Sequence, residues 1–246
     1  MDIGGWTSAF ADLEQEWRSI AGERRSELSV EDWARLFEEL KTEQGRLKGD
    51  GRWVSGHADL MHLAGVADLE VSHSNIVAWL LNPAGRHGFS DRLLRAILED
   101  GWRDSDVPST ASAVVEREVP DGSRIADIVI YMGPTTLVIE NKVLSDESKW
   151  QCEDLYQIWS GRGKDVRFLL LTRDGHPPRE TQTQAAADTW RRLSYPSLAG
   201  WLHENLPTPP QSLAQKTVEQ YVETIRLTCR GRQKFHVEVG GGHVSE

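Results

Sequence analysis

Two neighbouring apolar segments, each interrupted by charged residues, most constrain what this chain can fold into. They cover residues 124–131 and 137–143, and both are rich in isoleucine and valine. Turn residues bound each segment, so each is predicted to form a buried β-strand. Gly133 and Pro134 lie between them and suit a hairpin turn. The sequence therefore predicts a pair of strands near the centre of the fold.

Three charged side chains, Asp127, Glu140 and Lys142, lie within these segments. A charge buried in a strand is costly unless a partner or a metal ion compensates it. Because strand side chains alternate in direction, Glu140 and Lys142 share one face and Asn141 takes the other. If the strands pair, Asp127 lies beside Glu140. The half-buried cluster suits a divalent cation bound by oxygen atoms, with a lysine beside it. The alternative is a structural ion pair at an edge of the sheet.

Composition and net charge limit the kinds of protein in which this cluster can occur. The 246 residues fit one domain with extensions, and a hydrophobic share of 39% is enough for a core. The widely separated Cys152 and Cys229, with no secretory signal, predict a reducing, cytoplasmic setting. No apolar run approaches the roughly 20 residues that span a bilayer, so we expect no membrane association. The net charge of −10 disfavours non-specific binding to nucleic acid, so such binding would need a local site.

Hydrophobic periodicity predicts helices around the two strands. Ser29 is the expected N-cap of the second N-terminal helix, and Ser90 of a helix further along. Within the helical stretch at 59–81, Ser72 or Ser74 could restart the helix. Segment 182–194 is interpreted as weakly helical and then polar. The predicted helices cover about 7–25, 30–48, 59–81, 90–98, 147–159, 198–206 and 213–229, and the further strands cover 114–119 and 166–172.

Three strands, a helix and another strand predict an α/β fold with a mixed central sheet flanked by helices. We assign residues 1–50 to an N-terminal helical extension, 51–232 to the main domain and 233–246 to a tail.

The motifs in these segments resemble the PD-(D/E)XK nuclease superfamily, in which an acid precedes Glu-X-Lys on the next strand. Residues 124–127 (Arg-Ile-Ala-Asp) and 139–142 (Ile-Glu-Asn-Lys) are similar to motifs of one bacterial branch of that superfamily. Ala126 stands where the motif's name has proline. Further similarity covers residues 70–74, 76–83, 87–88, 169–172 and 190–195, with Gln151 and Tyr156 on the intervening helix.

The resemblance implies a restriction-endonuclease-like sheet and a site for Mg²⁺ or Mn²⁺. Asp127 and Glu140 would be metal ligands, together with the carbonyl of Asn141 or Val143. Lys142 would orient the attacking water or stabilise developing negative charge, and as an ammonium between carboxylates it should stay protonated.

Other residues carry two interpretations each. Glu70 is the expected third acid of the metal site, or else a solvated helix residue; Glu116 and Glu118 on the strand at 114–119 are rivals for that role. Gln151 is assigned to the catalytic set with Asp127, Glu140 and Lys142, the alternative being an exposed helix residue. We assign three residues to substrate binding: Arg124, Tyr156 and His87. The alternative is a salt bridge for Arg124, a position in the core for Tyr156 and a contact within a loop for His87.

These implications predict a metal-dependent nuclease that hydrolyses phosphodiester bonds, with DNA endonuclease activity and a role in anti-phage defence. A homodimer or a partner subunit in a defence complex is the expected assembly. The alternative function is a catalytically inactive module of the same fold that binds nucleic acid or protein.

Overall fold

The computed structural model describes residues 29–52, 59–103, 106–145, 147–163 and 165–229. The chain divides into two compact units, Met1–Gly56 and His57–Glu246. In the first unit, α2 (Val30–Gly49) begins at a capping box in which Ser29 and Asp32 bond each other's backbone N–H, as expected for Ser29. The helix predicted over 7–25 and the tail at 233–246 lie outside the described residues.

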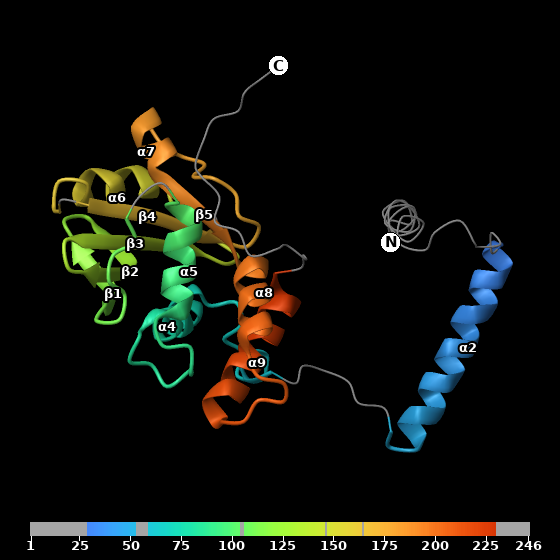
Figure 1. Cartoon of the computed structure of the whole chain (residues 1–246). Helices are drawn as coiled ribbons and strands as arrows, with labels where there is room; N and C mark the ends of the chain where they lie inside the picture. The colour runs from blue at the N-terminus through green and yellow to red at the C-terminus, as the bar shows by residue number, and fades with distance from the viewer. Residues whose placement is uncertain (1–28, 53–58, 104–105, 146, 164, 230–246) are drawn as a thin grey trace. The chain divides into compact units, whose positions relative to one another are not determined.

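The second unit is built on a five-stranded sheet in the order β1-β2-β3-β4-β5 (Figure 1). The first three strands are antiparallel, whereas β4 and β5 run parallel to β3. This confirms the predicted α/β class with a mixed sheet flanked by helices. The strands are β1 (Val114–Asp121), β2 (Arg124–Met132), β3 (Thr135–Lys142), β4 (Asp165–Thr172) and β5 (Trp190–Ser194).

The predicted hairpin between β2 and β3 forms at Gly133 and Pro134. Gly133 has a φ of +63°, which is easily reached only without a Cβ. Pairing starts at Met132 with Thr135 and continues to Ile128 with Ile139. This register carries the two acids of the strands to the far end of the hairpin.

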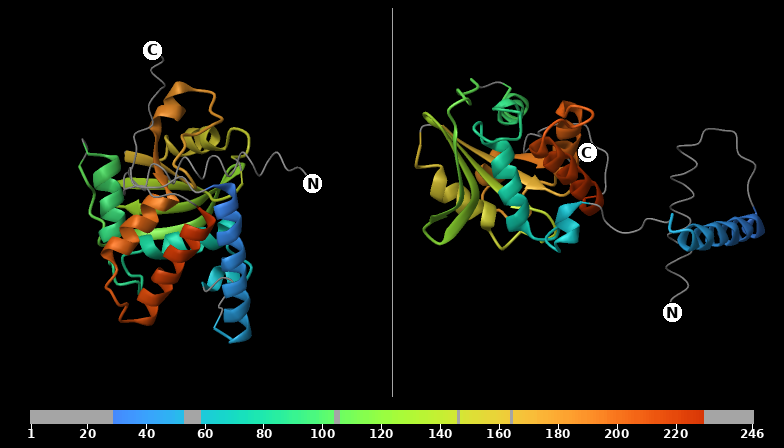
Figure 2. Two further views of the ribbon diagram at one scale, coloured as in Figure 1. Left: turned by 90° about the vertical axis from the view of Figure 1, so that its right-hand side faces the viewer. Right: turned by 90° about the horizontal axis from the view of Figure 1, so that it is seen from below.

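Helices cover both faces of the sheet, each over its own apolar cluster. One face, with Ile128, Leu137 and Leu169, packs against α4, α5, α8 and α9, and the other, with Val138 and Leu170, packs against α6. Figure 2 shows the same layers from two further directions. No helix of the described residues is both long and apolar enough to cross a membrane. The helices are α3 (Leu60–Leu63), α4 (Glu70–Leu81), α5 (Arg92–Gly101), α6 (Gln151–Trp159), α7 (Gln184–Thr189), α8 (Tyr195–Asn205) and α9 (Leu213–Thr228).

Some predicted boundaries were wrong. The helical stretch predicted at 59–81 is broken, because Gly65 takes a φ of +69° after α3 and a turn follows. The helix restarts at Glu70, before the predicted restart at Ser72 or Ser74. The helix expected from 147 begins only at Gln151. Ser90 has a φ of +53° and does not cap α5; Asp91 precedes that helix.

Strand β5 is the main element that the sequence did not predict. Trp190–Ser194 directly follows the short α7 and pairs in parallel with β4, from Phe168–Trp190 to Thr172–Ser194. Five residues carry too little periodicity to identify a strand, and its pairing partner is about twenty residues away. The pairing with β4, which only the tertiary fold supplies, decides the conformation.

Candidate active site

The hairpin strands part at the point where their two acids meet. The last β2–β3 pair is Ile128 with Ile139, one position short of Asp127 and Glu140. Beyond it, the backbone N–H of Asn141 donates a hydrogen bond of 2.8 Å to the carboxylate of Asp127. The side chain of Asp127 thus satisfies a backbone donor of β3 and stays next to Glu140.

Glu140 is completely buried, with an exposed fraction of 0%. Its Oε1 lies 2.8 Å from Nζ of Lys142 and accepts a hydrogen bond from the side-chain amide of Gln151, at the start of α6. Its Oε2 is buried and finds no hydrogen-bond partner among the described residues. A buried carboxylate oxygen without a hydrogen-bond donor is unfavourable in a purely structural ion pair, so this oxygen, next to Asp127, is suited to contact a cation.

Lys142 lies between two acids that come from different elements. Besides the contact with Glu140, its Nζ lies 3.4 Å from the carboxylate of Glu70, in the first turn of α4. Lys142 is itself buried, with an exposed fraction of 8%. Because α4 lies far from β3 in sequence, this meeting of charges depends on how the helix packs on the sheet.

Glu70 also holds the segment that follows β3. Its Oε1 accepts hydrogen bonds from the N–H of Val143 at 3.1 Å and from the hydroxyl of Ser145 at 2.6 Å. Its carboxylate therefore already has several partners in this structure, and its first function is to brace the chain beyond Lys142. Its proposed second function, as a metal ligand, stays a prediction.

Asn141 points to the other face of the sheet, as the alternation of β3 requires. Its amide nitrogen donates to the hydroxyl of Ser74 at 2.9 Å, and its amide oxygen accepts from the hydroxyl of Tyr195 at 2.6 Å. The same nitrogen lies 3.3 Å from the backbone carbonyl of Glu70. The side chain of Asn141 thus ties β3 to α4 and α8, and only its backbone carbonyl is left for the predicted metal contact.

The burial of these charges shifts their pKa values. Burial raises the pKa of Glu140 to about 8, the negative charge of Asp127 adds to the effect, and Lys142 only partly opposes it. Burial also raises the pKa of Asp127, against the lowering effect of the Asn141 N–H and of Lys142. Burial lowers the pKa of Lys142, but the carboxylates of Glu140 and Glu70 outweigh it and the net shift is upward. At neutral pH the lysine is therefore charged, and the Asp127–Glu140 pair retains a proton.

This donor set fits a hard divalent cation. In the described parts of the chain no group of three or more His, Cys, Asp or Glu side chains is arranged to hold a metal ion. Magnesium, however, is commonly held by one or two carboxylates together with water and substrate phosphate. Asp127 and Glu140 supply two carboxylates, and Oε2 of Glu140 supplies an oxygen atom that accepts no hydrogen bond. A cation would stabilise the charged carboxylates that burial disfavours.

Gln151 joins the cluster, whereas the residues predicted to bind substrate make other contacts. Arg124 forms an ion pair of 2.7 Å with Asp154 on α6 and donates to the carbonyl of Lys149. The ring of Tyr156 packs against Phe168, with ring centres 5.7 Å apart.

His87 lies in the loop after α4. Its ring bonds the carbonyl of Asn82 and the N–H of Phe89, and a Cβ on Gly85 would collide with it. These contacts hold a loop conformation. Glu116 and Glu118, the rival acids on β1, are both exposed.

Three residues around the cluster were not predicted from the sequence: Ser74, Ser145 and Tyr195. They hold Asn141 or Glu70 in place through hydrogen bonds. Ser145 lies three residues after Lys142, and Ser74 and Tyr195 lie in segments that resemble the family, so position was the signal that each of them carried. Ser74 and Tyr195 meet Asn141 through the packing of α4 and α8, which periodicity alone does not reveal.

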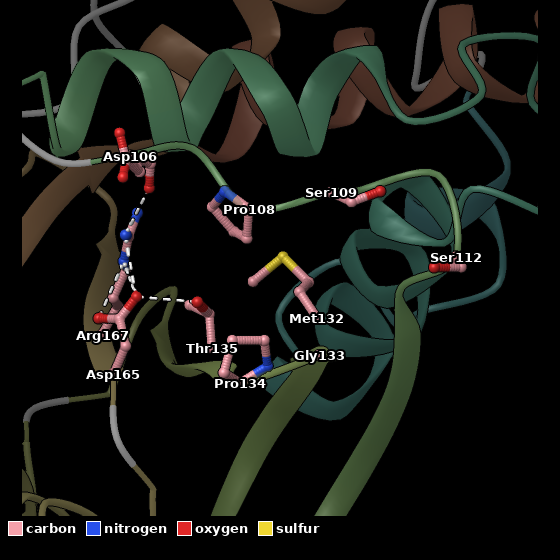
Figure 3. A pocket seen from close by; sticks show the side chains of 10 residues that line it. All are labelled: Asp106, Pro108, Ser109, Ser112, Met132, Gly133, Pro134, Thr135, Asp165 and Arg167. Carbon is pink, nitrogen blue, oxygen red and sulfur yellow. Dashed lines mark hydrogen bonds and ion pairs between the residues drawn. The ribbon is translucent and has the colours of Figure 1, made fainter.

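A groove of about 620 Å³ lies at the opposite end of β3, beside the hairpin turn (Figure 3). Arg167 and Asp165 form an ion pair of 3.0 Å at its wall, and Thr135 donates to the same aspartate. This groove is separate from the acidic cluster. Its lining consists of Asp106, Pro108, Ser109, Ser112, Met132, Gly133, Pro134, Thr135, Asp165 and Arg167.

Comparison with known families agrees with this geometry. A family model described as the PD-(D/E)XK nuclease superfamily matches residues 58–223, more than half of the 246 residues. Searches among curated proteins and among solved structures gave no match. The matched span contains Asp127 and the Glu140-Asn141-Lys142 triplet. Nucleases of this superfamily generally use divalent metals, and membership suggests nuclease activity on nucleic acid. With its mixed sheet and its acidic cluster at the parted ends of β2 and β3, the chain belongs to the PD-(D/E)XK nuclease superfamily.

Proposed function

We propose that this protein is a Mg²⁺-dependent deoxyribonuclease that cuts within DNA chains, with Asp127, Glu140 and Lys142 at its centre. The observation that carries the proposal is the unpaired, buried Oε2 of Glu140 beside Asp127 and a charged lysine. A structural ion pair would satisfy its own oxygen atoms, whereas a site prepared for a cation leaves one open.

In this proposal each side chain has a defined task. Asp127 and Glu140 would hold a Mg²⁺ ion, or Mn²⁺ in its place, and the backbone carbonyl of Asn141 would be a further ligand. The bound ion would lower the pKa of a water molecule and offset the charge of the phosphodiester. Lys142, which keeps its proton, orients that water and stabilises negative charge developing on the phosphate.

Gln151 acts through Glu140. Its amide donates to Oε1 of Glu140, while its own carbonyl accepts from the hydroxyl of Ser148 at 3.0 Å. The contacts of Oε1 leave Oε2 as the carboxylate oxygen that can contact a metal ion. We therefore assign Gln151 the positioning of Glu140 in the proposed catalytic set.

The test is cleavage of circular and linear DNA with Mg²⁺, with Mn²⁺ and with EDTA. We expect nicking or cutting of circular DNA with either ion and none with EDTA. Asp127→Ala and Lys142→Ala, purified in the same way, should be inactive. Equal activity in these variants would show a contaminating nuclease and would overturn the proposal. An RNA substrate in parallel decides between deoxyribonuclease and ribonuclease.

The rival function is an inactive module that binds nucleic acid or protein without cleaving it. Calorimetric titration with Mg²⁺ or Mn²⁺ separates the two, because an inactive module should give no heat of binding. The presence of Glu140 and Lys142 in buried strand positions, with the half-buried Asp127 beside them, supports the enzyme, since buried charges are costly without a task.

We further propose that the nuclease acts in anti-phage defence, as a homodimer or with a partner subunit. The support is the resemblance to one bacterial branch of the superfamily. Plaque counts on cells carrying the wild-type protein or Lys142→Ala test this function, and protection by both proteins equally would contradict it. Light scattering of the purified protein measures its assembly.

A further inference from the structure

Trp150 is a large aromatic side chain exposed at the edge of the candidate active site. It has an exposed fraction of 41% and directly precedes Gln151, whose amide touches Glu140. A tryptophan ring is apolar over most of its surface, so its exposure loses the favourable burial that such rings normally gain.

The backbone of Trp150 is held in a conformation that is unfavourable for its residue type. Its φ of 59° and ψ of 22° lie in the left-handed region, which glycine and asparagine adopt more easily. Such conformations persist where surrounding contacts enforce them, and they cluster at functional sites.

Hydrogen bonds of the neighbouring backbone enforce this conformation. The N–H of Asp154 donates to the carbonyl of Trp150 at 2.9 Å. Arg124 donates to the carbonyl of Lys149 at 2.8 Å and to the hydroxyl of Ser148 at 3.3 Å. The backbone is thus fixed on both sides of Trp150 while its ring stays accessible, and Nζ of Lys149 lies 4.4 Å from the ring centre.

We propose that Trp150 is a stacking platform for an unpaired nucleobase next to the scissile phosphate. This inference rests on the proposed nuclease function and adds a preference for cuts next to an unpaired base, in a single strand or at an unpaired end. A base can lie flat on an exposed indole ring only if it is not stacked within a duplex, and such stacking tolerates any base. The ammonium of Lys149 lies over one face of the ring, and it supplies a positive charge for the phosphate of a base stacked on the other face.

The negative net charge of the protein favours base stacking as a source of binding affinity. With a net charge of −10, the chain gains little from releasing the counterions of a polyanion. Stacking does not depend on that release, so it supplies affinity that salt does not remove.

The experiment compares steady-state cleavage by the full chain on three oligonucleotides: a single strand, the same strand with an abasic site next to the cut, and a blunt duplex. Trp150→Asn removes the ring and tolerates the left-handed backbone, whereas Trp150→Tyr retains an aromatic ring. Trp33→Ala, which removes an exposed tryptophan of α2, is the matched control. Melting temperatures confirm that each variant is folded.

We expect Trp150→Asn to raise KM for the single strand about tenfold, the order of one base–aromatic stack, with kcat nearly unchanged. Trp150→Tyr should restore most of the affinity, and Trp33→Ala should have no effect. The abasic site should raise KM for the wild-type protein to a similar extent but add nothing in Trp150→Asn. The ratio of KM between variant and wild type should stay constant between about 50 and 200 mM salt.

Three results would overturn the stacking proposal: an unchanged KM, additive effects of the variant and the abasic site, or the same rise in KM on the blunt duplex. If the wild-type protein cleaves none of the substrates, the proposed nuclease function fails instead. Fluorescence anisotropy of the same labelled strands in EDTA then tests Trp150 alone. Binding weakened by Trp150→Asn supports the platform, and binding that is absent or unaffected refutes it.

Discussion

The carboxylate of Asp127 accepts a hydrogen bond of 2.8 Å from the backbone N–H of Asn141, where the next rung of the β2–β3 ladder would otherwise form. One acid side chain thereby ends the ladder, satisfies the freed donor and lies beside Glu140. The side chain of Asp127 thus accounts both for the separation of β2 from β3 and for the position of the acidic cluster.

Two substitutions at Asp127 separate its charge from its hydrogen bond. Asp127→Asn removes the charge but keeps an oxygen for the Asn141 N–H, so the metal-free protein should unfold with a free energy close to that of the wild type. Asp127→Ala leaves the N–H without this acceptor, which costs about 1–3 kcal/mol. Urea denaturation in EDTA measures both values. Both variants should lose at least about 100-fold in cleavage rate, and equal stabilities would show that the hydrogen bond contributes nothing.

The metal-free protein should become less stable as the pH rises from about 5 to 8. The pKa of Glu140 is raised from 4.5 to about 8. In that window the folded state therefore holds a proton that the unfolded state has released, so the free energy of unfolding falls with pH by at most about 1.4 kcal/mol per unit. Urea denaturation at several pH values in EDTA gives the slope. Glu140→Gln should flatten it, and a wild-type slope that is already flat would contradict the raised pKa.

Binding of Mg²⁺ should release a proton, because the ion needs both carboxylates ionised. The apparent affinity should therefore increase as the pH approaches about 8, the pKa of Glu140. Calorimetric titrations in two buffers of different ionisation enthalpy count the protons released. Glu140→Gln is the control, since it has no proton to give up at this position. A pH-independent affinity would argue against Glu140 as a ligand.

Glu70 offers a choice between bracing the chain and binding the metal. Glu70→Gln keeps an oxygen for Val143 and Ser145 but removes the charge. If Glu70 is chiefly a brace, this variant should keep activity within about tenfold of the wild type, since the effect is indirect. Glu70→Ala should lose stability as well as activity. A loss in Glu70→Gln as large as that in Asp127→Asn would instead make Glu70 a ligand.

Removal of the hydroxyl of Tyr195 should reduce stability rather than catalysis. Tyr195→Phe leaves the buried amide oxygen of Asn141 without its donor at 2.6 Å, which costs about 1–3 kcal/mol. Because Asn141 faces away from the acids, kcat should change little where the variant is folded. Thermal unfolding and cleavage assays at low temperature check the two expectations. A large drop in kcat without a loss of stability would tie Tyr195 to the chemistry.

Features that depend on interactions between residues close in sequence were predictable, whereas features that depend on contacts between distant segments were not. The hairpin was predictable because the apolar runs and the turn at Gly133 and Pro134 are local signals. Charged residues are unusual in apolar strands, because burying a charge is costly. For this reason Asp127, Glu140 and Lys142 could be predicted as a candidate cluster from the sequence. Strand β5 was not predictable, because its conformation depends on pairing with β4.

The sequence by itself determined the strand pair, the mixed α/β class and the identity of the three charged residues, because each follows from local pattern and from the cost of burying charge. Only the tertiary structure decided which other residues these three contact. The packing of α4 brings Glu70 to Lys142, and that of α6 brings Gln151 to Glu140. The first contact joins residues 72 positions apart and the second residues 11 positions apart, and no local periodicity records that these side chains will meet.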